Sequence, residues 1–426
     1  MTGGPLGARG SPRRAAVWIV AAIVGGGVQA QSTGEISEVA GFKAGAAIVA
    51  PSLTLGYAYD TNVLAIPDDF VPPPSPDAVL TVQPALALTL PFSNSMFRFG
   101  DVLTYVDYKN TPQTNGKTSN DAVADLTLNF GTLDRLDIAA HNITGVAQSI
   151  AFDPGGEATF QGNSFTLHTE AVSLSREIDG ARGYRLSLER NAVRFDPSIT
   201  VNFFNYRGFD GEAAFLQPVS PKTWISFGYL GTRYDHFFAS DPSVVFRSES
   251  GDAIYGQIEG QLGPRQPYTV RLGWQRLNFS GPGVNEADSF SGIIGQAKLS
   301  AIVGGGTMFT VLAQRQPYRS FVTSNNYYVF DVLGLWVDRP FPQGSSVGGD
   351  IAFSSNGYNQ PISEGLSDTP FYRQDRRFLL EAYANLALAK RIAFRVSLAR
   401  NRRYSNAPGA DYNDTVVFGG FVFGWI

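Results

Sequence analysis

Cysteine is absent from this chain of 426 residues, and only three histidines occur, His141, His168 and His236. The lack of cysteine excludes disulfide frameworks, thiolate metal sites and cysteine nucleophiles, and so few histidines do not favour a multi-histidine metal centre. Charged residues are scarce at 16%, and a formal net charge of −4 argues against nucleic acid as a partner. No glycine-rich loop has the strand–loop–helix context of a nucleotide site, so no cofactor is implied.

After the first 30 residues the chain also lacks any apolar run of about eighteen residues, so transmembrane helices are not expected. What it has in quantity is glycine and aromatic residues: 46 Gly, 31 Phe and 18 Tyr, together with 25 Pro. Glycine and proline weaken helix interiors, whereas aromatic residues favour strands. The composition therefore predicts many strands joined by turns.

The N-terminal residues have the three parts of a secretory signal peptide. Three arginines supply the positive region, AAVWIVAAIV is the apolar core, and GGGVQA offers small residues for cleavage between Ala30 and Gln31. A single-span membrane anchor is the alternative, but the apolar core is well short of the ~20 residues that cross a bilayer. We therefore expect a signal peptide over residues 1–30.

Apolar and polar residues alternate in many segments of the remaining chain. In KRIAFRVSLARNRRY (residues 390–404), isoleucine, phenylalanine, valine and leucine alternate with arginine, alanine and serine, and RRFLLEAYANLALA, YTVRLGWQ and VLTVQPALALTL alternate likewise. Successive side chains of a β-strand point to opposite faces, so each segment predicts a strand with one apolar face. Such strands occur in soluble sandwiches and in transmembrane barrels, whose apolar face meets lipid.

The lengths of the connections separate these two architectures. Short connections such as PFSNS and GTLDR alternate with long ones such as AIPDDFVPPPSPDA and IAFDPGGEATFQGN. Short periplasmic turns and long external loops give this alternation in outer-membrane barrels, and a sandwich has no reason for it. The predicted fold is all-β, a single antiparallel transmembrane β-barrel of about eighteen strands. We expect a short periplasmic segment over 31–45 and the barrel over 46–426.

The polar face of each strand is expected to line the interior of the barrel. By residue parity, the charged lumen-lining residues are Arg98, Asp125, Arg185, Glu189, Glu259, Arg271, Asp331, Glu381, Arg391 and Arg395. Both signs of charge are present, so ion selectivity should be modest. The alternative for each residue is a solvated wall residue that pairs with its neighbour.

Two segments resemble known outer-membrane barrels. The chain ends in TVVFGGFVFGWI, where Phe421, Phe423, Trp425 and Ile426 resemble a bacterial assembly signal, although such signals usually end on an aromatic residue. The first predicted hairpin contains Tyr-Asp-Thr-Asn-Val at 59–63 and resembles the start of the beta-barrel porin type 2 family. In architecture this resemblance covers essentially the whole mature chain. It implies passage of solute or polysaccharide, because some members are similar to porins encoded beside exopolysaccharide-export genes.

A comparison with general porins concerns the third long connection, IAFDPGGEATFQGN. In many general porins the third external loop folds into the lumen and narrows it. The resemblance implies that Asp153 and Glu157 could face arginines across the pore. An ordinary external loop is the alternative.

Three functions are compatible with these features. The leading hypothesis is a passive channel for small hydrophilic solutes, which needs only a charged, hydrated wall. The alternative is an exit barrel for exopolysaccharide, in which Tyr255 and Tyr383 could stack on sugars. An outer-membrane hydrolase is less favoured, because neither His141 nor His168 has a serine or aspartate partner visible by spacing. No catalytic, cofactor-binding or metal residue is predicted.

All three hypotheses place the protein in the outer membrane of a Gram-negative cell, exported by the general secretory route. The expected partners are outer-membrane lipid, lipopolysaccharide and, during insertion, the barrel-assembly machinery. Polysaccharide-export proteins are further partners under the exit-barrel alternative. External acidic loops could bind Ca²⁺ that bridges lipopolysaccharide, but no ligand spacing supports a defined site.

Overall fold

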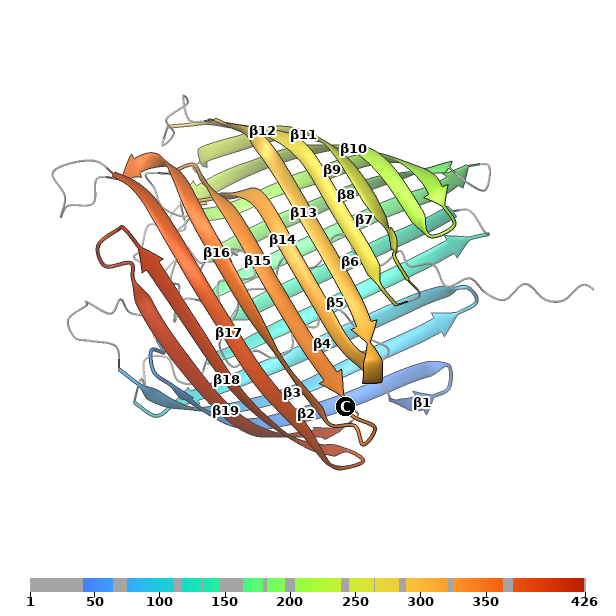
Figure 1. The fold of residues 1–426 in the computed structure, drawn as a ribbon, viewed down its shortest axis with the longest axis vertical. Coiled ribbons are helices and arrows are strands. Elements are labelled where there is room, and N and C mark those ends of the chain that lie inside the picture. Colours follow the sequence, from blue (N-terminus) through green and yellow to red (C-terminus); the bar gives the residue numbers. More distant parts are fainter. Residues whose placement is uncertain are drawn as a thin grey trace, which may run out of the picture.

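The computed structural model describes residues 41–63, 75–110, 117–131, 134–145, 164–178, 182–195, 204–238, 245–263, 265–282, 289–320, 325–362 and 371–424. These residues form one closed antiparallel barrel of eighteen β-strands, with one further short strand beside it (Figure 1). The prediction of an all-β barrel of about eighteen strands is confirmed. In the described part of the chain, no α-helix has the length and apolar character needed to cross a bilayer. The expected signal peptide, with Ala30 and Gln31, lies outside the described residues.

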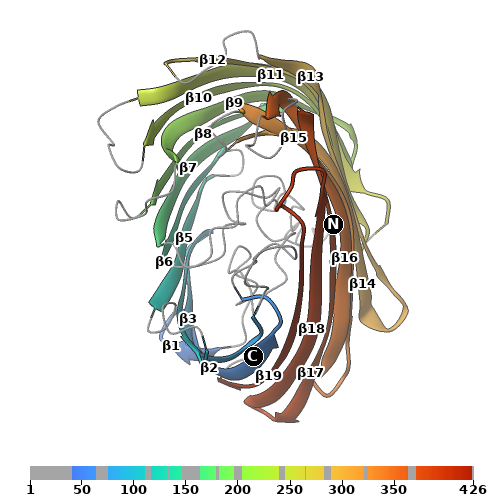
Figure 2. The same cartoon turned by 90° about the vertical axis from the view of Figure 1, so that its left-hand side faces the viewer.

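The strands are β1 (Phe42–Ala44), β2 (Ala47–Asp60), β3 (Asp77–Phe92), β4 (Ser95–Tyr108), β5 (Lys117–Phe130), β6 (Asp134–Gly145), β7 (Phe165–Ile178), β8 (Arg182–Phe195), β9 (Phe204–Ser220), β10 (Thr223–Phe238), β11 (Val245–Gln261), β12 (Pro267–Ser280), β13 (Phe290–Val303), β14 (Thr307–Arg319), β15 (Tyr327–Pro340), β16 (Ser346–Ile362), β17 (Phe371–Ala389), β18 (Ile392–Ser405) and β19 (Tyr412–Gly424). A 3-10 turn, η4 (Gly304–Gly306), joins β13 to β14. Viewed along the barrel, the cross-section is elongated, with β10 to β13 at one narrow end (Figure 2).

The connections alternate in length around the barrel. Those at one end have two to five residues, and those at the other end have six to nineteen. We call these the short-turn end and the long-loop end. The alternation predicted from the sequence is therefore present in the fold. Some short turns need a positive φ, as at Gly45 (φ 66°) and Gly131 (φ 68°), which glycine adopts without steric cost.

Contacts that pass over intervening strands identify the inner face of the barrel. Arg271 on β12 donates a hydrogen bond to Glu212 on β9 at 3.3 Å, across β10 and β11. A side chain can reach over two strands only on the concave side of a curved sheet, so these residues face inward. The opposite face of the same strands carries large apolar side chains, such as Ile254 (65% exposed) and Leu272 (64% exposed).

The outer face of β17 gives the height of this apolar band. Every outward residue from Phe378 to Leu388 is Phe, Leu or Ala. Those ten steps span about 33 Å along the strand at ~3.3 Å per residue. With a strand tilt of about 40°, the band is about 25 Å high, which is the height expected for the lipid-facing band of a transmembrane barrel.

The barrel closes where β19 pairs with β2, and the Tyr-Asp-Thr-Asn-Val motif lies at this seam. Thr61 donates its backbone N–H to the carbonyl of Thr415 at 3.1 Å, and its Oγ1 accepts the N–H of Thr415 at 2.8 Å. Asn62 Nδ2 donates to the carbonyl of Asn413 at 3.3 Å. The motif thus extends the pairing of the first and last barrel strands past the end of β2. These contacts give Thr61 and Asn62 of the motif a structural role at the seam.

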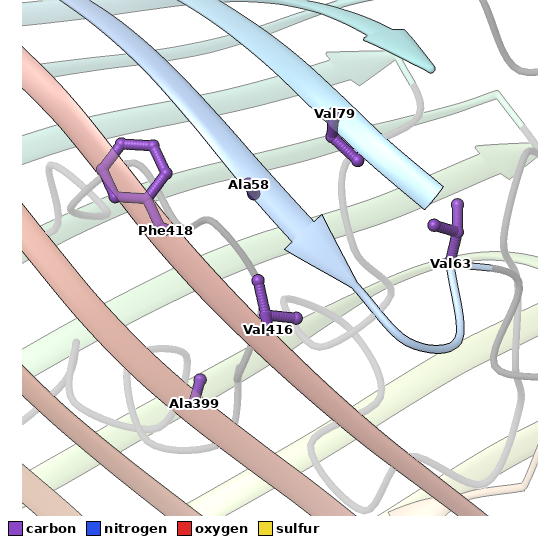
Figure 3. Close-up of a cluster of buried hydrophobic side chains, with 6 residues drawn as sticks. All are labelled: Ala58, Val63, Val79, Ala399, Val416 and Phe418. Carbon is purple, nitrogen blue, oxygen red and sulfur yellow. The ribbon is translucent and has the colours of Figure 1, made fainter. Parts of the chain in front are cut away.

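Small and apolar side chains fill the inner face of the seam (Figure 3). Ala58, Val416 and Phe418 form a buried cluster with Val63 from the motif, and Val79 and Ala399 complete it. The ring of Phe418 covers Gly56 on β2, where an added Cβ would overlap it. At the other end of β2, β1 pairs from Val49 toward Ala47, beyond the last β19 pair at Ser52. β1 therefore covers the edge of β2 that β19 leaves open.

Candidate functional site: the charged inner wall

A network of charged and amide side chains spans five neighbouring strands, β8 to β12, on the inner wall. Glu212 is 4.0 Å from Arg185 on β8 and 3.3 Å from Arg271 on β12. Arg271 Nε also donates to Gln257 Oε1 at 2.8 Å, and Gln257 Nε2 donates to Glu259 Oε2 at 2.8 Å. Positive and negative groups therefore alternate along the wall.

A cross-strand pair of tyrosine and glycine makes this network possible. Tyr255 on β11 is paired with Gly228 on β10, and a Cβ added at Gly228 would overlap the Tyr255 ring. The ring therefore lies across the glycine, and the guanidinium carbon of Arg271 lies 4.1 Å from its centroid. A cation over an aromatic face is attracted by the ring quadrupole. Because Gly228 has no side chain, the Tyr255 ring can lie flat against the wall, and the Arg271 guanidinium packs on the ring.

The same arrangement recurs six strands further round the barrel. Tyr383 on β17 is paired with Gly348 on β16, and a Cβ at Gly348 would overlap the tyrosine. The Tyr383 hydroxyl donates to Asp338 on β15 at 2.7 Å. The Arg395 guanidinium on β18 lies 5.2 Å from the Tyr383 centroid and 3.5 Å from Glu381. In each case the glycine lies on the strand before the tyrosine and the arginine on the strand after it.

A third tyrosine–glycine pair lies nearer the long-loop end. The Tyr234 ring on β10 covers Gly208 on β9, and its hydroxyl donates to Asp210. The guanidinium carbon of Arg319, the last residue of β14, lies 3.3 Å from the Tyr234 centroid, and its Nε lies 2.8 Å from Glu249 on β11. The arginine therefore joins strands that are not neighbours, at the narrow end of the barrel.

A second buried arginine stabilises the connection between β14 and β15. Arg247 is 1% exposed, and its guanidinium donates to the carbonyls of Asn325 and Ser320, both at 2.8 Å. Its Nη2 is also 3.3 Å from His236 Nδ1. These bonds satisfy two backbone carbonyls of the connection between β14 and β15, so the arginine fixes this connection against the wall.

The structure places eight of the predicted lumen residues on the inner face of their strands: Arg98, Asp125, Arg185, Glu189, Glu259, Arg271, Glu381 and Arg395. Arg98 and Asp125 occupy paired positions on β4 and β5. Glu189 accepts a hydrogen bond from Asn191 Nδ2 at 2.7 Å. The inner position of these residues follows from strand parity, and their use in transport stays a prediction.

Two predicted lumen residues lie elsewhere. Asp331 has the parity of the exposed Leu333 and Leu335, faces outward, and is bonded to Arg315 at 2.8 Å. Its segment YVFDVLGLWV is apolar on both faces, so polarity gave no guide to the inner side. Arg391 belongs to the two-residue turn between β17 and β18 rather than to a strand.

Other predicted residues divide between the outer face and the undescribed part of the chain. Phe421 faces outward, where its ring lies 5.2 Å from Phe394 and 6.2 Å from Phe423. Trp425 and Ile426 lie outside the described residues, as do Asp153 and Glu157 of the expected constriction loop.

The histidines considered for catalysis lie in three different settings. His141 faces inward with Nε2 2.8 Å from Asp121 Oδ1, His168 is exposed on the outer face of β7, and His236 is buried beside Arg247. In the part of the chain that the structure describes, no group of three or more His, Cys, Asp or Glu side chains could hold a metal ion. What the inner wall offers chemically is fixed charge.

Sequence reasoning missed several residues of this wall. Asp210 and Glu212 could have been found, because Phe209 and Phe215 in FDGEAAF have the opposite parity. Arg319 could not, because it has the parity of the outer face and only its position at the strand end lets it reach inward. The glycines opposite the tyrosines give no signal without the strand register.

Among comparisons with known proteins, similarity was found to solved structures of β-barrels. No protein-family model matches the chain, and no curated protein matches it. The outer membrane protein OpdK from Pseudomonas aeruginosa is similar with a TM-score of 0.46 and 13% identity, over 88% of this chain and 99% of OpdK. OpdQ from the same organism has a TM-score of 0.44 and 10% identity, over 89% of this chain and 98% of OpdQ.

The FrpB iron transporter from Neisseria meningitidis is similar with a TM-score of 0.46 and 9% identity, over 84% of this chain. This chain covers 62% of the length of FrpB. Similarity at this level carries no argument about what passes through any of these barrels, or about this chain's function.

Proposed function

We propose that this protein is a channel in the outer membrane of a Gram-negative cell, through which small hydrophilic solutes pass passively. One observation carries the proposal: a closed barrel has a network of charged and amide side chains on its inner wall and an apolar band about 25 Å high on its outer face. In a soluble protein such a band would cause association, because exposed apolar area of this size drives proteins together. The hydrocarbon of a lipid bilayer is the environment that suits this apolar band.

The character of the inner wall supports weak selectivity. Arg271 and Arg185 share Glu212, and Arg395 lies near Glu381, so each described patch carries both signs of charge. A wall of paired charges attracts water and ions of either sign without holding one solute tightly. The pairs are held by tyrosines and by neighbouring strands, so their positions should persist while solutes pass.

The tyrosines do not favour the exopolysaccharide alternative. The Tyr255 ring lies against Gly228, and the guanidinium carbon of Arg271 lies 4.1 Å from the ring centroid. The Tyr383 ring likewise lies against Gly348, and the guanidinium carbon of Arg395 lies 5.2 Å from its centroid. A sugar would have to displace an arginine to stack on either ring. The Tyr-Asp-Thr-Asn-Val motif at the seam supports a relationship to the beta-barrel porin type 2 family, and insertion by the barrel-assembly machinery follows from the proposed location.

Reconstitution in planar bilayers tests the proposal directly. Purified protein is expected to give discrete conductance steps in KCl, with a reversal potential near zero in a salt gradient. Liposomes containing it should swell in small sugars and swell less as the sugar grows. Correctly folded protein that inserts into bilayers but gives neither conductance nor swelling would overturn the proposal.

A further inference from the structure

Arginines recur on the outer face of the barrel, near its long-loop end. These arginines lie on strands from β8 to β18, both included. Each is within five residues of the end of its strand that leads into a long loop. Two of them have outward acidic partners: Arg190 is 3.0 Å from Glu170, and Arg315 is 2.8 Å from Asp331. Charged side chains beside a lipid-facing band are costly unless something of opposite charge meets them.

Three of these arginines form a compact group on two paired strands. Arg376 on β17 and Arg400 and Arg402 on β18 all face outward, and the first two are exposed. Arg376 is paired with Tyr404 and Arg402 with Phe378, so Arg376 and Arg402 are diagonal neighbours, and Arg400 is one step below on the same face. We call Arg376, Arg400 and Arg402 the outer arginine patch.

The outer arginine patch has little to balance it in the described part of the chain. Of the described contacts, only the cation–π contact of Arg402 with Tyr404, at 4.3 Å, involves these guanidinium groups. The acidic residues of β16 to β19 all have inward parity, and Asp411, in the connection after β18, accepts the backbone N–H of Ser405. Three positive charges therefore stand together on a face that has no outward carboxylate on those strands.

The residues around the patch match an amphiphile with phosphates above and acyl chains below. Toward the long-loop end lie the exposed rings of Tyr372 and Tyr404, which suit a membrane interface. Toward the short-turn end the outer face becomes apolar, with Leu380 and Leu398 next to the patch. Arginine matches phosphate geometry with two parallel hydrogen bonds, so the patch fits the phosphate groups of a lipid.

We propose that the outer arginine patch binds the phosphate groups of lipopolysaccharide in the surrounding leaflet. This inference rests on the proposed function, because it needs the barrel in an outer membrane with its long-loop end outside. The apolar band below the patch contacts the acyl chains, and the guanidinium groups bind the phosphates above them. The outer face of β17 and β18 is therefore the side of the barrel at which we expect a lipid to bind most tightly.

The test compares two triple variants that remove the same charge at opposite ends of the barrel. The patch variant is Arg376→Gln, Arg400→Gln and Arg402→Gln. The control variant is Arg176→Gln, Lys222→Gln and Lys390→Gln, three basic residues at the short-turn end. Lipopolysaccharide, enzymatically dephosphorylated lipopolysaccharide and phosphatidylglycerol are titrated into each protein in detergent, and bound lipid is counted by native mass spectrometry.

The patch variant is expected to bind lipopolysaccharide about tenfold more weakly than the unaltered protein, since exposed ion pairs are individually weak and three are removed. The control variant should bind it unchanged, and dephosphorylated lipopolysaccharide should bind all three proteins equally weakly. Equal loss in both variants, or equal loss of phosphatidylglycerol and lipopolysaccharide in the patch variant, would overturn the assignment.

The two proposals fail separately in this design. Folding of each variant is checked by its heat-dependent gel mobility, and its conductance is measured in planar bilayers without lipopolysaccharide. Unchanged lipopolysaccharide binding by a conducting patch variant rejects the lipid site and leaves the channel intact. Folded proteins that never conduct, with lipopolysaccharide binding lost only in the patch variant, reject the channel and leave the lipid site.

Discussion

Arg315 and Arg319 lie four residues apart on β14, and a nitrogen of each is 2.8 Å from a carboxylate oxygen. Arg315 and Asp331 face outward, with side chains 50% and 41% exposed. Arg319 and Glu249 lie inside the barrel, with side chains 22% and 2% exposed. The same contact distance therefore belongs to two interactions of different strength, because the inner pair has lost most of its water and the outer pair has not.

The surroundings of the two arginines differ in the same way. Arg319 lies over the Tyr234 ring, and Arg271 and Arg395 lie over Tyr255 and Tyr383. Each of these three inner arginines is thus fixed by an aromatic ring and an acidic partner. The arginines of the outer patch have neither an outward carboxylate on β16 to β19 nor a hydrogen bond of their guanidinium groups among the described residues. Arginines that are held by a ring and a carboxylate suit a wall along which solutes move. The guanidinium groups of the outer arginine patch are suited to binding an anionic partner.

Breaking the inner pair should have the largest effect. Glu249→Gln leaves the buried Arg319 without its counter-charge, and removing one partner of a buried pair costs about 3–5 kcal/mol. Urea unfolding of the refolded barrel in lipid vesicles, followed by tryptophan fluorescence, measures the free energy. A loss below about 1 kcal/mol would show that the inner pair is as weakly coupled as a surface pair.

Removing a tyrosine–glycine pair should have the next largest effect. Gly228→Ala forces the Tyr255 ring off the wall and separates it from Arg271, and overpacking of this kind costs about 1–3 kcal/mol. Gly256→Ala on β11 is the matched control, because it faces outward and its Cβ would lie 3.9 Å from Phe227. The same unfolding experiment compares them. Equal stability of the two variants would show that the glycine is not needed for the ring.

The charge of the inner wall should show in ion selectivity. Glu212→Gln leaves Arg185 and Arg271 without their shared acid, and Arg271→Gln does the opposite. The chloride-to-potassium permeability ratio should rise about twofold in the first variant and fall in the second, since one charge acts on a nearby ion through water with less than ~1 kcal/mol. Reversal potentials in a KCl gradient measure it.

The outward Arg276→Gln is the control for those reversal potentials. Its side chain is on the exposed face of β12, so the permeability ratio should not change. A shift as large as that of Glu212→Gln would contradict the assignment of the two faces.

The smallest effect is expected at the outer pair. Asp331→Asn removes the acid beside Arg315, and exposed pairs contribute about 0–1 kcal/mol. The unfolding free energy should therefore stay within about 1 kcal/mol of the unaltered protein. A loss comparable to that of Glu249→Gln would remove the distinction between the inner and outer arginines.

The alternation of residues predicted the strands because it is a local property of each strand, and the alternating lengths of the connections predicted the barrel. Parity also predicted the inner position of Arg271 and Glu381, where one face is clearly apolar. It gave the wrong side for Asp331, since both faces of that strand are apolar. The Tyr255–Gly228 pair and the Arg319–Glu249 pair depend on strand register and on which strands meet at the narrow end, and no local pattern in the sequence carries that information.

The absence of cysteine allows the central claim, that the apolar face meets lipid and the charged face meets water, to be tested residue by residue. Single cysteines at Ser397 and Leu398, neighbours on β18, can each carry a nitroxide label in the reconstituted barrel. Oxygen, which is concentrated in lipid, should relax the label at 398 more strongly, and a water-soluble nickel chelate should relax the label at 397. Equal relaxation at both sites, or the reverse order, would contradict the account.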